Sequence, residues 1–152
     1  MKKKISTHLA VPERRNHNDP NVLEGKKIFF KSGCTSCHTP KFKTIESKYS
    51  RALSNQIIRP YSDFLLHDMG PGLADENTEF LADGSEWRTQ PLWGIGLTKE
   101  VSGHTNFLHD GRAKNILEAI LWHGGEAERS KNKILKLSKI EINQLIDFIE
   151  SL

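Results

Sequence analysis

The sequence predicts an all-α protein with long loops. Two segments near the C-terminus have the apolar spacing of amphipathic helices, and a third helical pattern precedes a pair of cysteines. No segment alternates apolar and polar residues over a useful length, so we expect no extended β-sheet. The 152 residues are enough for one domain of ordinary size, and no internal repeat is visible.

The N-terminal residues 1–18 are basic and polar and contain Pro12, so we expect an arm or linker there, followed by one domain over residues 19–152. The lysines at positions 2–4 resemble the start of an export signal, but no apolar segment follows them. We therefore expect no signal peptide in this chain, which leaves either a protein that needs no export or a piece of a longer one.

The first helix begins at Asp19-Pro20, an N-cap followed by proline at the first helical position, and runs to Gly33. Residues 39–60 are polar and irregular, with a possible short helix around 47–58. Residues 68–106, rich in glycine, proline and tryptophan, show no periodicity and are expected to form a long loop region. Such a loop is unusual unless it wraps a bound group.

The clearest helical patterns lie near the C-terminus. The first covers residues 113–122, and Gly124-Gly125 ends it. The second begins at Ser138, whose spacing to Glu141 is that of a capping box. Apolar residues then recur at helical spacing, which indicates one buried face: Ile142, Leu145, Ile146, Ile149 and Leu152.

The composition limits the possible functions. Apolar residues make up 36% of the chain and charged residues 27%, so the core is small and a bound cofactor would help to fill it. The net charge of +3 is spread along the chain without a basic stripe, so we predict no nucleic-acid partner. We also predict no transmembrane segment, because no apolar run is long enough.

Both cysteines lie in the stretch "GCTSCHTP", residues 33–40, and His38 follows the second one directly. A thiol–disulfide pair usually opens a helix after a strand, and no such unit is predicted. A zinc site usually needs two cysteine pairs, and this chain has one. The Cys-x-x-Cys-His spacing is typical of c-type haem attachment, in which Cys34 and Cys37 form thioethers and His38 ligates the iron.

These residues predict a cytochrome c-like haem domain with one haem c per chain. Of the candidates for the sixth iron ligand we favour His123, which shares an apolar helix face with Ile116 and Ile120 and needs a buried partner. Gly124 and Gly125 lack a Cβ that would obstruct a porphyrin. The alternatives are a core histidine bonded to a backbone carbonyl, or ligation by another residue: Met69, the main rival, His8, His17, His67, His104 or His109.

Other polar and aromatic residues have two readings each. Arg112 is expected to contact a haem propionate or to form a solvated salt bridge. Trp87, Trp93 and Trp122 could relay electrons, but we expect all three to be large core residues. The charge run over 126–133 is expected to be a solvated face.

Four segments carry a family resemblance: "GKKIFFKSGCTSCHTP", "PYSDFLLHDMGPGLAD", "EWRTQPLWGIG" and "NFLHDGRAKNILEAILWHGGEA". Over residues 9–152 the chain resembles the C-terminal half of the bacterial di-haem oxidoreductases, also described as thiol-oxidoreductase-like, relatives of bacterial cytochrome c peroxidase. Family members usually carry a second Cys-x-x-Cys-His in an N-terminal domain, which is absent from this chain.

The resemblance implies that the C-terminal haem relays electrons to a second haem, where peroxide reacts. It implies an N-terminal haem domain or another redox protein as partner, an isolated chain that is a poor peroxidase, and a periplasmic or cell-envelope location. His123 falls where the peroxidases place a methionine ligand. The family's calcium site stays in question, because residues 103–106 depart from its pattern.

Overall fold

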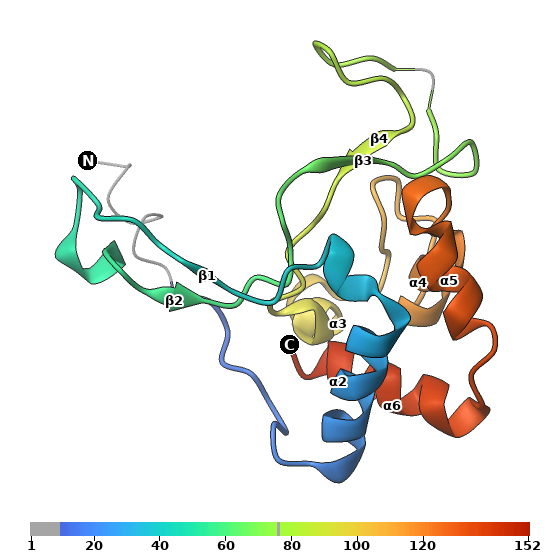
Figure 1. Ribbon diagram of the computed structural model, residues 1–152, viewed down its shortest axis with the longest axis horizontal. Coiled ribbons are helices and arrows are strands. Elements are labelled where there is room, and N and C mark those ends of the chain that lie inside the picture. The colour runs from blue at the N-terminus through green and yellow to red at the C-terminus, as the bar shows by residue number, and fades with distance from the viewer. Residues whose placement is uncertain (1–9, 76) are drawn as a thin grey trace.

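A computed structural model describes residues 10–75 and 77–152 (Figure 1). Its helices are α2 (Pro20–Ser32), α3 (Thr98–Ser102), α4 (Ile116–Trp122), α5 (Glu128–Ile134) and α6 (Lys139–Glu150). Short 3₁₀ turns lie between them at Cys34–Ser36, Arg51–Leu53, Ile95–Leu97 and Gly125–Ala127. Helices α2 and α6 pack against each other, and the long loops extend from that pair (Figure 1).

Helix α2 has the ends that its sequence predicts. The Asp19 carboxylate accepts a hydrogen bond from the backbone N–H of Asn21, and Pro20 occupies the first turn. Gly33 ends the helix in the left-handed region, at φ 90°, which costs a glycine little because it has no Cβ. This turn directs the chain into the two cysteines.

Helix α6 begins with the predicted capping box, in which Ser138 and Glu141 bond each other's backbone N–H groups. Its buried face contains Leu145 and Ile149, as predicted, and also Phe148, which the predicted stripe omitted. Phe148 meets Phe29 of α2 edge-on, with ring centres 5.2 Å apart. The crossing of α2 and α6 lies at the centre of the core. The buried residues of the core are Val22, Ile28, Phe29, Tyr61, Ile116, Ile134, Leu145, Phe148, Ile149 and Leu152.

Helix α4 starts later than the predicted residue 113. Asn115 caps it by accepting a hydrogen bond from the backbone N–H of Glu118 at 2.8 Å, so the helix begins at Ile116. Ala113 instead forms a β-bridge with Phe107. The charge run after α4 folds into η4 (Gly125–Ala127) and α5, so this segment is helical.

Two small antiparallel sheets make the fold mixed rather than all-α. Strand β1 (Phe42–Lys43) pairs with β2 (Ile57–Ile58), and β3 (Leu66–Asp68) pairs with β4 (Glu86–Arg88). The possible short helix around 47–58 is confined to the 3₁₀ turn Arg51–Leu53, because Asn55 takes a positive φ of 56° and the chain turns back into β2. The predicted loop over 68–106 likewise contains β4 and α3.

Residues 10–18 run along the C-terminal end of α6. The backbone N–H of Arg15 donates to the Ser151 carbonyl at 2.8 Å, and the Arg14 guanidinium lies over the Phe148 ring. Across residues 10–75 and 77–152, the helices are too short or too polar to cross a membrane.

Candidate functional site

The two cysteines follow α2 directly. Cys34 opens a 3₁₀ turn, packs against the core and is a free thiol, as is Cys37. Burial raises the pKa of Cys34 to about 11. Burial and the nearby carboxylates of Asp63 and Glu126 raise the pKa of Cys37. Because the thiolate is the nucleophile, this setting disfavours thiol exchange.

His38 is anchored through one ring nitrogen. Its Nδ1 lies 2.8 Å from the carbonyl oxygen of Tyr61. A carbonyl can only accept, so Nδ1 carries the proton and Nε2 keeps a free lone pair. Burial lowers the pKa of His38 to about 4, so the ring is neutral at pH 7. A neutral imidazole with a fixed tautomer is prepared to ligate a metal.

His123, on a different element, has the same arrangement. It caps the C-terminal end of α4, and its Nδ1 donates to the Ala119 carbonyl at 2.7 Å. Burial lowers its pKa as well. The ring centres of His38 and His123 are 6.5 Å apart, and the ring planes are inclined by 41°. The chain therefore brings together the two histidines that its sequence favours as iron ligands.

This spacing fits one metal ion between two imidazoles. With imidazole nitrogen–metal bonds of about 2 Å on each side, the ring centres would be roughly 6 Å apart. The alternative interpretation of His123, a core histidine bonded to a backbone carbonyl, is also met. That hydrogen bond uses Nδ1 and leaves Nε2 available. The two readings are therefore compatible, and ligation by His123 stays a prediction.

The glycines after His123 have a role that the sequence did not indicate. A Cβ on Gly124 would lie 2.7 Å from the carbonyl oxygen of Met69, and a Cβ on Gly70 would lie 2.8 Å from the backbone nitrogen of Gly125. The turn that ends α4 thus packs directly on the backbone after β3. This close contact between two main-chain segments requires glycine at positions 70 and 124. The expectation that Gly124 and Gly125 leave room for a porphyrin stays a prediction.

Arg112 forms a salt bridge, which is one of the two roles that the sequence suggested for it. Its Nε donates to the Asp110 carboxylate at 2.6 Å, and its Nη1 donates to the Gly72 carbonyl at 2.5 Å. The guanidinium lies 4.8 Å from the ring centre of Trp122. The propionate contact stays a prediction.

The tryptophans are less buried than expected. Trp122 is 41% exposed, so the prediction that it is a core residue is wrong. It lies on the outer surface of α4, where Arg112 covers one face of its ring. Trp87 is half-buried and stacks on His109 with ring centres 3.6 Å apart. Trp93 is also half-buried.

Asp63, His67 and Glu126 form a hydrogen-bonded group beside Cys37 that the sequence did not indicate. His67 donates from Nε2 to Asp63 and from Nδ1 to Glu126, both at 2.8 Å. Burial alone would lower the pKa of His67, but hydrogen bonds to Glu126 and Asp63 outweigh it and raise the pKa. Ligand atoms of Cys37, Asp63 and His67 lie within 4.8 Å of one another, but both ring nitrogens of His67 are already bonded to carboxylates.

Most of the remaining candidate ligands are exposed or otherwise engaged, whereas the Met69 backbone lies against Gly124, beside His123. His17 and His104 are exposed, and His109 is occupied by its stacking on Trp87. Met69 is half-buried, and its backbone N–H donates to Ser85. His8 lies outside the described residues.

Comparison with known proteins gives one match. Searches of curated proteins and of solved structures find no match to this chain. The family described as "Di-haem oxidoreductase, putative peroxidase" matches residues 4–152, nearly the whole sequence. This agrees with the resemblance seen in four separate segments and with a haem cofactor. The chain therefore belongs to the di-haem oxidoreductase family.

Proposed function

We propose that this chain is an electron-transfer domain with one covalently attached haem c. Cys34 and Cys37 would hold the haem through two thioethers, and His38 and His123 would ligate its iron. The observation that carries the proposal is the facing pair of neutral imidazoles, 6.5 Å apart, one of which directly follows the cysteine pair.

The hydrogen bonds of the two histidines explain what the protein contributes. The Tyr61 and Ala119 carbonyls hold Nδ1 of His38 and His123, so Nε2 is the ring nitrogen of each that is left to ligate a metal. A bound haem supplies one-electron redox chemistry at its iron. With both histidines as ligands, the chain would leave no position on the iron open for peroxide. The site therefore supports electron relay rather than peroxide turnover.

Family membership supports the choice of partner. The family is di-haem, and this chain has one Cys-x-x-Cys-His, so the second haem belongs to another domain or to another protein. By resemblance this chain corresponds to the C-terminal haem domain. Haem c attachment further supports a periplasmic or cell-envelope location. A free-standing monohaem cytochrome is the alternative that keeps the same site.

Non-haem readings of the cysteine pair have weaker support. Zinc in structural sites takes four ligands, whereas Cys37, Asp63 and His67 offer three, and both ring nitrogens of His67 are already bonded to carboxylates. A thiol redox site would need a stabilised thiolate, whereas both cysteine pKa values are raised.

Covalent attachment is tested by expression in a strain that matures c-type cytochromes. We expect haem staining of the chain on a denaturing gel and resistance of the haem to acid–acetone extraction. The double variant Cys34→Ala/Cys37→Ala should lose both, while the matched control Ser32→Ala/Ser36→Ala should keep them. Haem that can be extracted from the unmodified chain, or staining that persists in the double cysteine variant, would contradict the proposal.

A further inference from the structure

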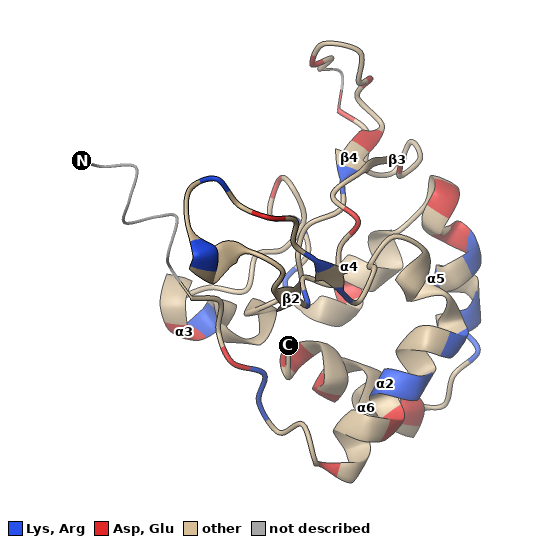
Figure 2. Ribbon diagram, turned by 60° about the vertical axis from the view of Figure 1, so that its left-hand side comes forward, with Lys and Arg blue, Asp and Glu red and all other residues tan. Residues whose placement is uncertain are grey.

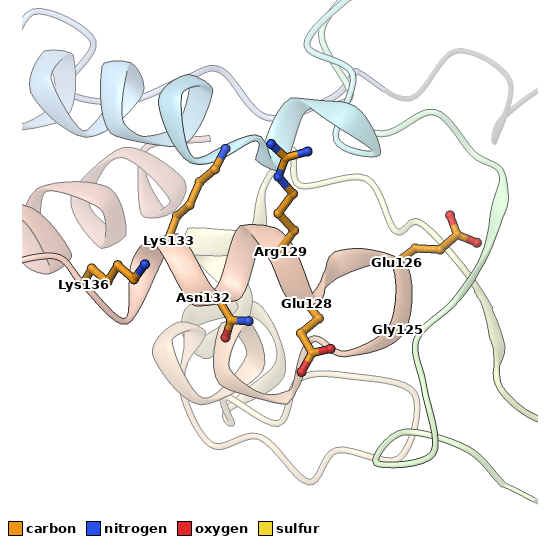
Figure 3. A pocket seen from close by; sticks show the side chains of 7 residues that line it. All are labelled: Gly125, Glu126, Glu128, Arg129, Asn132, Lys133 and Lys136. Carbon is orange, nitrogen blue, oxygen red and sulfur yellow. The ribbon is translucent and has the colours of Figure 1, made fainter.

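Two hollows meet on the face that α2 and α5 share. One runs along α5 (Figure 3) and is lined by Gly125, Glu126, Glu128, Arg129, Asn132, Lys133 and Lys136. The other lies on α2 and is lined by Leu23, Lys26, Lys27, Phe30 and Lys31. The Lys133 ammonium lies 3.4 Å from the Lys31 carbonyl oxygen, so the two hollows meet at the C-terminal end of α2.

This face has an exposed apolar centre. Leu23 and Phe30 are each 45% exposed, although the opposite side of the same helix is buried against α6. Lysines of α2 surround them. An apolar centre with a charged rim is the usual anatomy of a protein–protein interface.

The charge of the face is net positive, although Lys27 is paired with Glu24 at 2.7 Å. Figure 2 shows Lys and Arg along α5 and on α2, and in Figure 3 Arg129 and Lys133 point from α5 toward the end of α2. Of the carboxylates that line the two hollows, Glu126 is already bonded to His67, which leaves Glu128. We name as the basic face the residues Lys26, Lys27, Lys31, Arg129, Lys133 and Lys136, with Leu23 and Phe30 at its centre.

The basic face adjoins the haem attachment point. A Cβ on Gly33 would lie 3.6 Å from the Lys133 ammonium and 3.1 Å from the Ser130 hydroxyl. Gly33 immediately precedes Cys34, and the Lys133 charge acts on the Cys34 thiol. A protein bound to this face would therefore lie beside the edge at which Cys34 holds the haem.

We propose that the basic face is the docking surface for a redox protein with an acidic patch. This inference rests on the proposed electron-transfer function and names the class of its partner. A haem held by Cys34 and Cys37 would supply the one-electron acceptor, the docked reduced carrier would supply the electron, and no bond would be formed or broken. Complementary charge speeds such encounters and makes their rate sensitive to salt.

The test uses reduced flavodoxin, an acidic one-electron carrier, as the probe in stopped-flow reduction of the ferric chain. We expect a second-order rate that falls steeply with ionic strength and is lower with a basic carrier. The variant Lys27→Gln/Lys31→Gln/Lys136→Gln should lower the low-salt rate by about tenfold, within the range of electrostatic steering. Phe30→Ala should weaken flavodoxin binding, because it removes the apolar centre.

The matched control removes the same charge elsewhere, from three exposed lysines: Lys43→Gln/Lys48→Gln/Lys99→Gln. Equal rates for the two triple variants would overturn the proposal, since only the net charge would then matter. Binding of the unmodified chain to phosphatidylglycerol vesicles, with no effect of the face variant on flavodoxin, would also overturn it and indicate a membrane surface.

Failure of the proposed function is detected separately. Haem content is measured from the absorbance of each variant before the kinetics. Flavodoxin binding is also followed by NMR amide shifts, which need no electron transfer. If the chain carries no haem, the proposed function fails. The docking surface is then decided by flavodoxin binding alone: loss of binding in the basic-face variant supports it, and unchanged binding overturns it.

Discussion

Gly25→Ala tests the close crossing of α2 and α6 on which the cysteine turn depends. Gly25 is buried, and a Cβ there would overlap the Gln144 carbonyl and lie 2.9 Å from Cβ of Phe148. Alanine in a helix gains about 1 kcal/mol over glycine. Overpacking costs about 1–3 kcal/mol, and the upper value applies because one obstacle is backbone. We therefore expect a net loss of about 2 kcal/mol in the free energy of unfolding.

The assay is thermal unfolding followed by circular dichroism, on samples of equal haem content. For a chain of this size, about 3 °C is lost per kcal/mol, so the melting temperature should fall by about 6 °C. Lys27→Ala on the exposed side of the same helix is the control, and it should change the melting temperature by less than about 2 °C. A Gly25→Ala protein as stable as the unmodified chain would refute the crossing.

Three further predictions concern other parts of the chain. His67→Gln should destabilise the protein by about 1 kcal/mol near pH 6 and by less near pH 9. The reason is that the folded-state pKa of His67 is raised, so its stabilising charge is lost as the pH rises through that pKa. Equal losses in urea unfolding at both pH values would contradict this. Ser138→Ala should cost about 1 kcal/mol through loss of the capping box, and Ser138→Asp should restore it in the same urea assay; an unchanged unfolding midpoint in the alanine variant would refute the cap. The haem-loaded chain alone should turn over hydrogen peroxide far more slowly than the ~10 s⁻¹ of an ordinary enzyme, and a turnover near that rate in a steady-state assay would contradict the relay assignment.

Local signals account for what the sequence predicted well. The starts of α2 and α6 depend on side chains that bond their own neighbouring backbone, as Asp19 and Ser138 do, and α2 ends at a glycine with positive φ. The sheets depend on contacts between distant segments, such as the pairing of Leu66 with Arg88. Strands of two or three residues are too short to show an alternating pattern.

The same distinction holds at the candidate site. The Cys-x-x-Cys-His motif is contiguous, and His123 was favoured because it shares a face of its helix with apolar residues. The unit of Asp63, His67 and Glu126 forms only where β3 meets the turn before α5, and no local pattern predicts that contact. The packing of Gly124 on the Met69 carbonyl is equally non-local.

The visible and electron paramagnetic resonance spectra of the oxidised, haem-loaded chain test the central claim most directly. We expect a low-spin ferric iron without the red charge-transfer band of methionine ligation, and conversion to high spin in His123→Ala. His109→Ala, which removes a histidine stacked on Trp87, is the control and should stay low-spin. A methionine band in the unmodified chain, or a low-spin spectrum that survives in His123→Ala, would contradict axial ligation by His38 and His123.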